Sequence, residues 1–278
     1  MEIKKILVPL DASIYSEAAT STAIKLAKKL GASVTGVAVL DSPEIRSSIV
    51  PAVGPYYPLM IEAVQEKMNH ADQVLQETLR RFGDLCEEAG VAHEETEYEG
   101  IPAQKLLESS IFHDLIVMGL ETHFHFETRG GRGDTLDKLI DHTATPVLAV
   151  PASGLPELNS VMIAFDGSFG ASRALRDFIP FALTYAPEIT LVAADLPKEK
   201  SKFLLENAAA LLKSHGLKNI FTSASEESVE NTITPAATAE ADLIVAGIHS
   251  RRPLRDMFTG SFTATLIREH QKPLFLSH

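Results

Sequence analysis

The sequence predicts an α/β protein made of two tandem Rossmann-like domains, each an open parallel sheet of five strands with helices on both faces. Short apolar runs alternate with segments of helical periodicity along the whole chain. In addition, the run DLIVMG at Asp114–Gly119 recurs almost unchanged as DLIVAG at Asp242–Gly247. An apolar run entered by an acid and ended by a glycine is typical of a buried parallel strand. Its recurrence indicates that one folding unit is present twice.

Composition and charge limit the classes of function. The 278 residues correspond to about two domains, and 45% hydrophobic with 22% charged residues is typical of a well-packed soluble protein. The net charge of −12 disfavours nucleic acid and anionic membranes as partners. A single cysteine, Cys86, excludes an intramolecular disulfide, and the first residues lack the apolar core of a signal peptide. We therefore expect a cytoplasmic protein without a membrane partner.

The first half begins with a strand, a helix and a second strand. The run KKILVPLD ends in Asp11, and SVTGVAVLD forms the second strand. The segment between them is predicted to be a helix that starts near Ser13 and ends at Gly31. Its apolar residues keep helical spacing, at Ala19, Ala23, Leu26, Ala27 and Leu30.

An insert at about 42–60 has no counterpart in the second half. The longest apolar stretch of the chain, Ile49–Ile61, covers the second part of the insert. This stretch contains three prolines and two tyrosines, and is too short and too broken to span a bilayer. We favour a surface loop packed on its own domain over a lid or a partner-binding surface. A long helix follows and ends at Gly90, with Cys86 on its apolar stripe, where we expect a core residue and not a reactive thiol.

The remaining elements complete one five-stranded unit at residues 1–151. HEETEYEG is expected to be a polar third strand near an edge, and Pro102 suits the first turn of the next helix. The fourth strand is LIVMG, a helix follows around Leu136–Ile140, and TPVLAVP is the fifth strand.

The second half repeats this order after a short linker at 152–158 that contains glycine and proline. In the domain at 159–278, SVMIAFDGS places Asp166 where the first half has Asp11. A helix with Pro180 inside it, the strand ITLVAAD, a helix over Leu204–Leu212, DLIVAG and the final strand KPLFLSH follow.

The predicted ligand site lies at the carboxyl ends of the strands. In a doubly wound sheet, ligands bind where the strand order reverses. If strands one and four are neighbours, Asp11 faces the loop after Gly119, and Asp166 faces the loop after Gly247. A carboxylate there can accept hydrogen bonds from a ribose or an adenine, and a glycine-bearing loop that enters a helix can offer N–H groups to phosphates. The combination favours a nucleotide.

The second of these loops resembles that of the universal stress protein family. Nucleotide-binding members carry Gly-x2-Gly-x9-Gly-(Ser/Thr) after strand four and an aspartate at the end of strand one; here Gly247 and Ser250 are followed, after nine residues, by Gly260 and Ser261. The resemblance extends over both halves, including ILVPLDAS, IAFDGS and both DLIV runs. It implies the strand order 3-2-1-4-5, pairing of the two halves through their fifth strands, and an adenine nucleotide such as ATP, with magnesium as a candidate companion ion.

Carried over by residue, the resemblance implies a main site in the second half. The middle glycine of the motif is replaced by Ser250, whose backbone N–H and hydroxyl still suit a phosphate. Three arginines inside the loop form a positive patch in an acidic chain, against the alternative of a solvated basic turn. The implied residues are Asp166, Ala193 at the adenine position of strand two, Gly247, Ser250, Arg252, Gly260 and Ser261.

The first half departs further from the motif. Thr122 replaces the middle glycine, the next gap has ten residues, and Gly133 is followed by Asp134. A carboxylate at a phosphate-binding helix start repels an anion unless a divalent metal lies between them. We expect this site to be degenerate, although the glycines and arginines of the loop keep the opposite outcome open. Its residues are Pro9, Asp11, Val39, Gly119, Thr122 and Gly133.

A metal site is a weaker alternative in the same loop. His123 and His125 would project to one side of an extended segment and could bind zinc with Asp134 or Glu127. The competing interpretation is an exposed or loosely packed loop, which we favour.

Catalysis has little support in the sequence. It contains neither a Gly-x4-Gly-Lys-(Ser/Thr) loop nor a nucleophile elbow. The leading hypothesis is a tandem universal stress protein that binds ATP or a related adenine nucleotide, chiefly in its second half, as a sensor or regulator of the stress response. Two alternatives stay open: an interaction or small-ligand-binding protein with decayed nucleotide sites, and a weak metal-assisted ATPase. The sequence also leaves open a homodimer and the identity of any protein partner.

Overall fold

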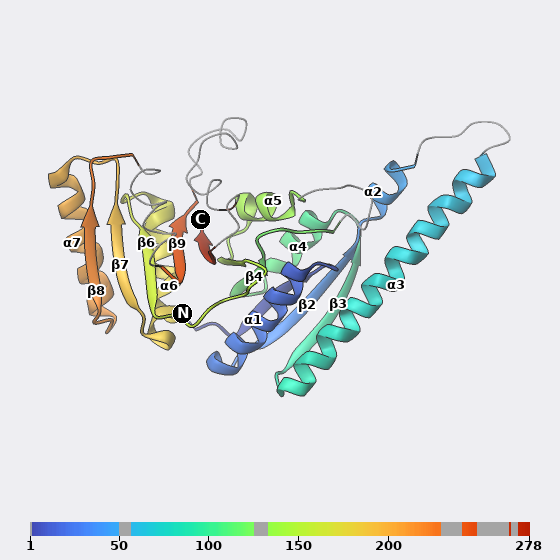
Figure 1. The fold of residues 1–278 in the computed structure, drawn as a ribbon, viewed down its shortest axis with the longest axis horizontal. Coiled ribbons are helices and arrows are strands. Elements are labelled where there is room, and N and C mark those ends of the chain that lie inside the picture. The colour runs from blue at the N-terminus through green and yellow to red at the C-terminus, as the bar shows by residue number, and fades with distance from the viewer. Residues whose placement is uncertain (1, 50–56, 125–132, 229–240, 249–266, 268–271) are drawn as a thin grey trace.

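The computed structural model describes residues 2–49, 57–124, 133–228, 241–248, 267 and 272–278. Within them, one sheet of ten strands runs through the molecule in the order β3-β2-β1-β4-β5-β10-β9-β6-β7-β8 (Figure 1). Each half contributes five neighbouring strands in the order 3-2-1-4-5. The α/β fold class is therefore confirmed, but the two predicted sheets are joined into one.

The first half follows the predicted alternation of strands and helices. Its elements are β1 Lys5–Leu10, α1 Ile14–Leu30, β2 Ser33–Leu40, α2 Ser42–Ser47, α3 Tyr57–Ala89, β3 His93–Glu99, α4 Pro102–Ser110, β4 Leu115–Gly119, α5 Thr135–His142 and β5 Val147–Val150. Ser13 caps α1 by accepting a hydrogen bond from the backbone N–H of Ser16, and Gly31 ends the helix at φ 65°. As predicted, β3 forms an edge of the sheet.

The second half repeats the pattern from β6 onward. Its described elements are β6 Ser160–Ala164, α6 Phe169–Tyr185, β7 Glu188–Ala193, α7 Lys198–Ser214, β8 Ile220–Ala224, β9 Leu243–Gly247 and β10 Leu274–Ser277. Ser168 caps α6 as Ser13 caps α1. The sequence analysis does not locate the strand β8, although it expects five strands in each half. Four of the five residues of β8 are exposed, so the strand has no apolar run. The segment 151–159 links the halves between β5 and β6, and the domain boundaries drawn there stay a prediction.

The two halves meet through their last strands. β10 runs antiparallel to β5, with Phe275 opposite Leu148, whereas the other strand pairs of the sheet are parallel. Phe275 is fully buried and packs against Phe178 and Phe181 of α6, with ring centroids 5.4 and 6.1 Å away. The junction is therefore part of a continuous core.

Helices cover both faces of the sheet. α1, α3, α6 and α7 pack on one face in one hydrophobic cluster, while α4 and α5 pack on the opposite face of the first half (Figure 1). Cys86 of α3 lies fully buried in the first cluster, and burial together with the nearby Glu95 carboxylate raises the pKa of its thiol to about 11. The thiol is thus a core residue, as predicted.

The insert is more helical than the sequence prediction allows. Ser42–Ser47 form α2, which begins with a hydrogen bond from the backbone N–H of Glu44 to Asp41. The long helix α3 begins at Tyr57, inside the segment expected to be a loop, because Pro58 is tolerated in a first helical turn. Buried residues of α3 begin at Ala71, so its first turns extend past the sheet (Figure 1). Residues 50–56 of the insert lie outside the described residues.

The acids of the two DLIV runs have a structural role. Asp114 Oδ2 accepts hydrogen bonds from the backbone N–H groups of Lys4 (2.8 Å) and Lys5 (2.9 Å). Asp242 Oδ2 accepts the equivalent bonds from Asn159 and Ser160, both at 2.9 Å. Each carboxylate thereby fastens the entry of the first strand of its half, at the edge opposite the predicted ligand site.

Candidate functional site

The carboxyl ends of β1 and β4 meet as predicted in the first half. The two strands are neighbours, and the Asp11 carboxylate, only 5% exposed, lies between the loops that follow them. Its Oδ1 accepts a hydrogen bond from the backbone N–H of Ser13 at 2.9 Å, and its Oδ2 accepts one from that of His123 at 2.6 Å. Asp11 therefore ties the β1 loop to the β4 loop.

Gly119 permits a close approach between β4 and α1. A Cβ added at this position would lie 2.5 Å from the Cβ of Tyr15 and 2.8 Å from the carbonyl oxygen of Glu121. Burial and the hydrogen-bonded Glu121 carboxylate raise the pKa of Tyr15. The same Glu121 lies 3.6 Å from His123 Nε2, so polar side chains hold the start of this loop.

The start of α5 brings Thr122 and Gly133 together. The Gly133 N–H donates to the carbonyl of Thr122 at 3.0 Å. The Thr122 hydroxyl is buried and has no hydrogen-bond partner among the described residues, which is costly unless another group satisfies it. Asp134 occupies the N-cap position without capping the helix, and its carboxylate pairs with Lys138 Nζ at 2.8 Å. A negative charge thus stands where a phosphate would approach.

The metal hypothesis gains nothing from these contacts. His123 is partly exposed beside Glu121, and Asp134 is engaged by Lys138. Across the described ranges, no three histidine, cysteine or acidic side chains cluster closely enough to hold a metal ion. His125 and Glu127 lie outside these ranges.

The second half repeats the geometry up to the end of β9. Asp166 Oδ1 accepts a hydrogen bond from the Ser168 N–H at 2.9 Å, as Asp11 does from Ser13. A Cβ at Gly247 would lie 2.2 Å from the backbone nitrogen of Ala171 and from the carbonyl carbon of Gly170. Glycine is therefore required at the end of β9 because the start of α6 packs directly on it.

The backbone at the end of β7 favours Ala194 over the predicted Ala193 as the equivalent of Val39. Backbone groups of a central parallel strand point alternately to its two neighbours. The Ala193 carbonyl accepts a hydrogen bond from the Ser225 N–H on the β8 side, whereas the Val192 carbonyl accepts one from Phe165 on the β6 side. Ala194, and not Ala193, consequently points its backbone groups past the end of β6.

The first half supports this assignment. The register pairs Pro9 with Val37 in β1 and β2, and Ala164 with Val192 in β6 and β7. Val39 therefore corresponds to Ala194. Val39 follows Asp11 by the same number of residues as Ala194 follows Asp166. This spacing could have identified Ala194 from the sequence alone.

The remaining predicted residues lie in the part of the chain that the structure does not describe. These are Ser250, Arg252, Gly260 and Ser261 of the main site. Of that site, the structure therefore shows only Asp166, Gly247 and the end of β7, which lie together at the carboxyl ends of the strands. The phosphate-binding loop stays a prediction.

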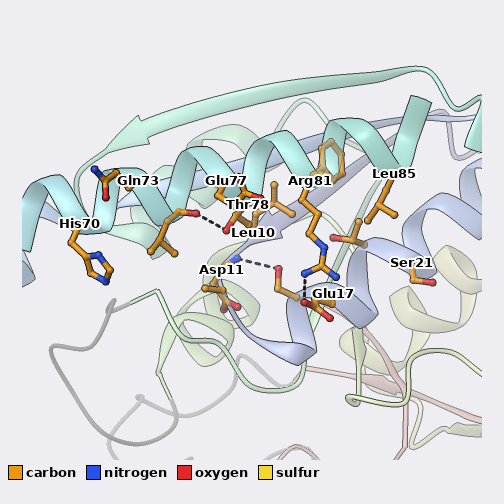
Figure 2. A pocket seen from close by; sticks show the side chains of 15 residues that line it. Leu10, Asp11, Glu17, Ser21, His70, Gln73, Glu77, Thr78, Arg81 and Leu85 are labelled. Atoms are coloured by element: carbon orange, nitrogen blue, oxygen red, sulfur yellow. Dashed lines mark hydrogen bonds and ion pairs between the residues drawn. The ribbon is translucent and has the colours of Figure 1, made fainter. Parts of the chain in front are cut away.

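A cavity adjoins Asp11 on the face covered by α1 and α3. Its volume is about 580 Å³, and its apolar lining includes Leu10, Val74 and Phe82. Figure 2 shows Arg81 of α3 pointing toward Glu17 of α1, with which it forms an ion pair that connects the two helices. His70 and Gln73 lie further along α3 at the same cavity. The first half therefore has a cavity next to Asp11 that is lined by both polar and apolar side chains and lies outside the predicted phosphate loop.

The fold is that of a tandem doubly wound α/β protein. Each half has a candidate ligand site where the carboxyl ends of its parallel strands meet. The sequence pattern of the Universal stress protein family matches residues 2–151 and 180–278. The chain belongs to this family, which confirms the resemblance inferred from its motifs. The second match begins after Asp166, so the equivalence of Asp166 with Asp11 depends on the geometry above.

Relatives of known sequence or structure agree with this assignment. Universal stress protein MJ0531 of Methanocaldococcus jannaschii is 33% identical over 150 residues, which are 53% of this chain and 81% of that protein. A universal stress protein structure from Archaeoglobus fulgidus has a TM-score of 0.72 at 20% identity and covers 99% of this chain and 96% of its own. A putative universal stress protein from Pseudomonas aeruginosa UCBPP-PA14 has a TM-score of 0.60 at 11% identity, with 99% and 93% covered. The two structures share the fold over both halves.

None of the helices in the described parts of the chain is long and apolar enough to cross a membrane.

Proposed function

We propose that this protein binds ATP or a related adenine nucleotide, chiefly in its second half, and acts as a cytoplasmic sensor or regulator of the stress response. The observation that carries the proposal is the placement of Asp166, Gly247 and Ala194 at one edge, followed in sequence by a loop with Gly260, Ser261 and three arginines. These groups match the needs of a ribose, an adenine and a polyphosphate.

The chemistry of each group suggests which part of the nucleotide it binds. The Asp166 carboxylate accepts hydrogen bonds from ribose hydroxyls, and the backbone of Ala194 offers a donor and an acceptor to the edge of an adenine. Backbone N–H groups near Gly260 and the hydroxyl of Ser261 bind phosphate oxygens, and Arg252 adds a charge-assisted contact. Magnesium is a companion ion of the phosphates, as in other polyphosphate sites.

The first half is proposed as the weaker site. Both oxygens of Asp11 already accept backbone hydrogen bonds, and the Asp134 carboxylate lies at the start of α5. A bound polyphosphate would place its charge close to this carboxylate, which opposes binding. Among the described residues of the loop after β4, the buried Thr122 hydroxyl is a group that favours a ligand here.

Calorimetric titration with ATP and magnesium tests the proposal. We expect saturable binding to the wild type and a loss of about 100-fold or more in the Gly260→Asp variant, because the new carboxylate faces the phosphates. The matched control is Ser214→Asp, which adds the same charge at the exposed end of α7 and should leave binding unchanged. Absence of binding to the wild type would overturn the proposal.

A second candidate function is the binding of a different small molecule in the first half. The cavity of about 580 Å³ between α1 and α3 favours it, since its size is that of a ligand pocket and its lining combines apolar with polar side chains. A small-molecule screen by thermal shift, repeated on Arg81→Gln, separates the two candidates. A hit that is lost in this variant but does not compete with ATP supports the second candidate; if every hit competes with ATP, it fails.

A further inference from the structure

A second cavity lies between the two halves, on the face of the sheet covered by α1 and α6. Its volume is about 640 Å³, within the range of small-molecule sites. The lining comes from the residues before β1, the end of α1, the second part of α6 and the end of α7. The apolar part of this lining consists of Ile3, Leu30, Ile179, Pro180 and Leu183. We call this space the inter-half cleft.

The polar lining of the inter-half cleft contains more cationic than acidic side chains. Lys4, Lys29 and Arg176 line it, against two acids, Glu2 and Asp177. Such a gathering is unusual in a chain with a net charge of −12.

Both acids of the cleft are already engaged. Glu2 pairs with Lys4 at 3.1 Å. The Asp177 carboxylate accepts a hydrogen bond from the Ser277 hydroxyl at 2.6 Å and lies 3.7 Å from Arg173. Lys29 and Arg176, by contrast, have no ion-pair partner among the residues that the structure describes.

Lys29 is held at the wall of the cleft by an aromatic ring. Its ammonium lies 3.8 Å from the ring centroid of Tyr185, a cation–π contact that joins α1 of the first half to α6 of the second. The ammonium keeps its three N–H donors and can turn one of them toward a ligand. This contact reduces the conformational freedom that Lys29 would lose on binding an anion.

Pro180 adds apolar surface to the same wall. Arg176 and Pro180 both line the cleft. The cleft thus combines two cationic donors without ion-pair partners and an apolar surface.

We propose that the inter-half cleft binds a small amphipathic anion, a carboxylate with a compact apolar body. The carboxylate lies between Lys29 and Arg176, and the apolar body covers Ile179, Pro180 and Leu183. The site is separate from the nucleotide edge, because it lies along α6 toward its last turns, whereas Asp166 and Gly247 lie at its first turn. Such a ligand contacts both halves at once, so its binding stabilises their relative position.

Octanoate is a suitable probe, and calorimetric titration of the full chain measures its affinity. We expect saturable binding that weakens about 10-fold in Arg176→Gln and in Lys29→Gln, because each variant removes one charge-assisted contact. Arg80→Gln is the matched control, since Arg80 is an exposed arginine of α3 that pairs with Glu77 and Asp84. Its affinity for octanoate should equal that of the wild type. Octanol, which has the same chain without the charge, should bind at least 10-fold more weakly than octanoate.

Three results would overturn this proposal. They are the absence of saturable octanoate binding, equal affinity in the wild type and in either cleft variant, and equal affinity for octanol and octanoate. Thermal unfolding of each variant checks that the fold is intact. Lys29 and Arg176 are both exposed, and either variant alone suffices for the decision. ATP binding is measured in the same samples, so that failure of the cleft and failure of the nucleotide site are told apart.

Discussion

The two halves of this protein hold their first strands in the same way and differ in the loop that follows the fourth strand. Asp114 and Asp242 fasten the first strand of each half with the same pair of bonds, and Asp11 and Asp166 accept the same hydrogen bond from the capping serine. After β4, however, the first loop carries Thr122 and Asp134, whereas the second carries Gly260 and Ser261. The framework is shared, and the difference lies in the groups that would meet a ligand.

The junction between the halves should give the largest effect on stability. Phe275 is fully buried among the aromatic rings of α6 and faces Leu148 across the β5–β10 pair. We expect Phe275→Ala to lower the free energy of unfolding by about 4 kcal/mol. Urea unfolding followed by circular dichroism measures it. A loss below about 1 kcal/mol would mean that the halves do not depend on this contact.

The strand-entry acids should have similar effects in the two halves. Each carboxylate accepts two backbone N–H groups, and Asp242 accepts a further hydrogen bond from the Ser160 hydroxyl at 3.2 Å. Asp114→Ala should therefore cost about 2 kcal/mol of unfolding free energy, and Asp242→Ala the same or slightly more. The same denaturation experiment compares them. If the two variants differed by more than about 1 kcal/mol in unfolding free energy, the two carboxylates would not have equivalent structural roles.

Replacing the aspartates at the candidate ligand sites should affect ATP binding differently in the two halves. We expect Asp166→Asn to weaken ATP binding about 10-fold, a change of about 1.4 kcal/mol, because a neutral amide is a poorer acceptor for ribose hydroxyls. The matched Asp11→Asn variant should change ATP affinity by less than about 2-fold, since the first half is not the main site. Calorimetry provides both numbers. The reverse order of effects would assign the nucleotide to the first half.

The helix caps should give the smallest effect, again equal in both halves. Ser13 and Ser168 each accept a backbone N–H at 3.2 Å at the start of α1 and α6. Replacing either with alanine should cost about 1 kcal/mol. Thermal unfolding of both variants is sufficient, and a cost confined to one half would contradict the equivalence of the two helix starts.

The sequence predicts the buried elements well because their periodicity is strong. The strands that end at Asp11 and Asp166 and both DLIV strands have apolar runs that leave few alternatives. The exposed strand β8 escapes detection for the opposite reason. The start of α3 at Tyr57 is also missed, because Pro58 signals a loop in sequence while a first helical turn accommodates it.

The candidate site is predicted less completely because part of it depends on backbone direction. Motif matching finds Asp166 and Gly247, since their residue types carry the chemistry. It selects Ala193 in place of Ala194, because the role belongs to the backbone and either side chain is compatible. Strand register and the hydrogen bonds of Val192 and Ala193 are needed to decide. The inter-half cleft is beyond sequence reasoning, since its residues come from four separate elements.

The most direct test of the difference between the halves is the stoichiometry of ATP binding to the wild-type chain, measured by calorimetry in the presence of magnesium. One nucleotide per chain, lost in Gly260→Asp and retained in Asp11→Asn, is the predicted result. Two nucleotides of similar affinity per chain would contradict it, because the first half would then bind as well as the second despite Thr122 and Asp134.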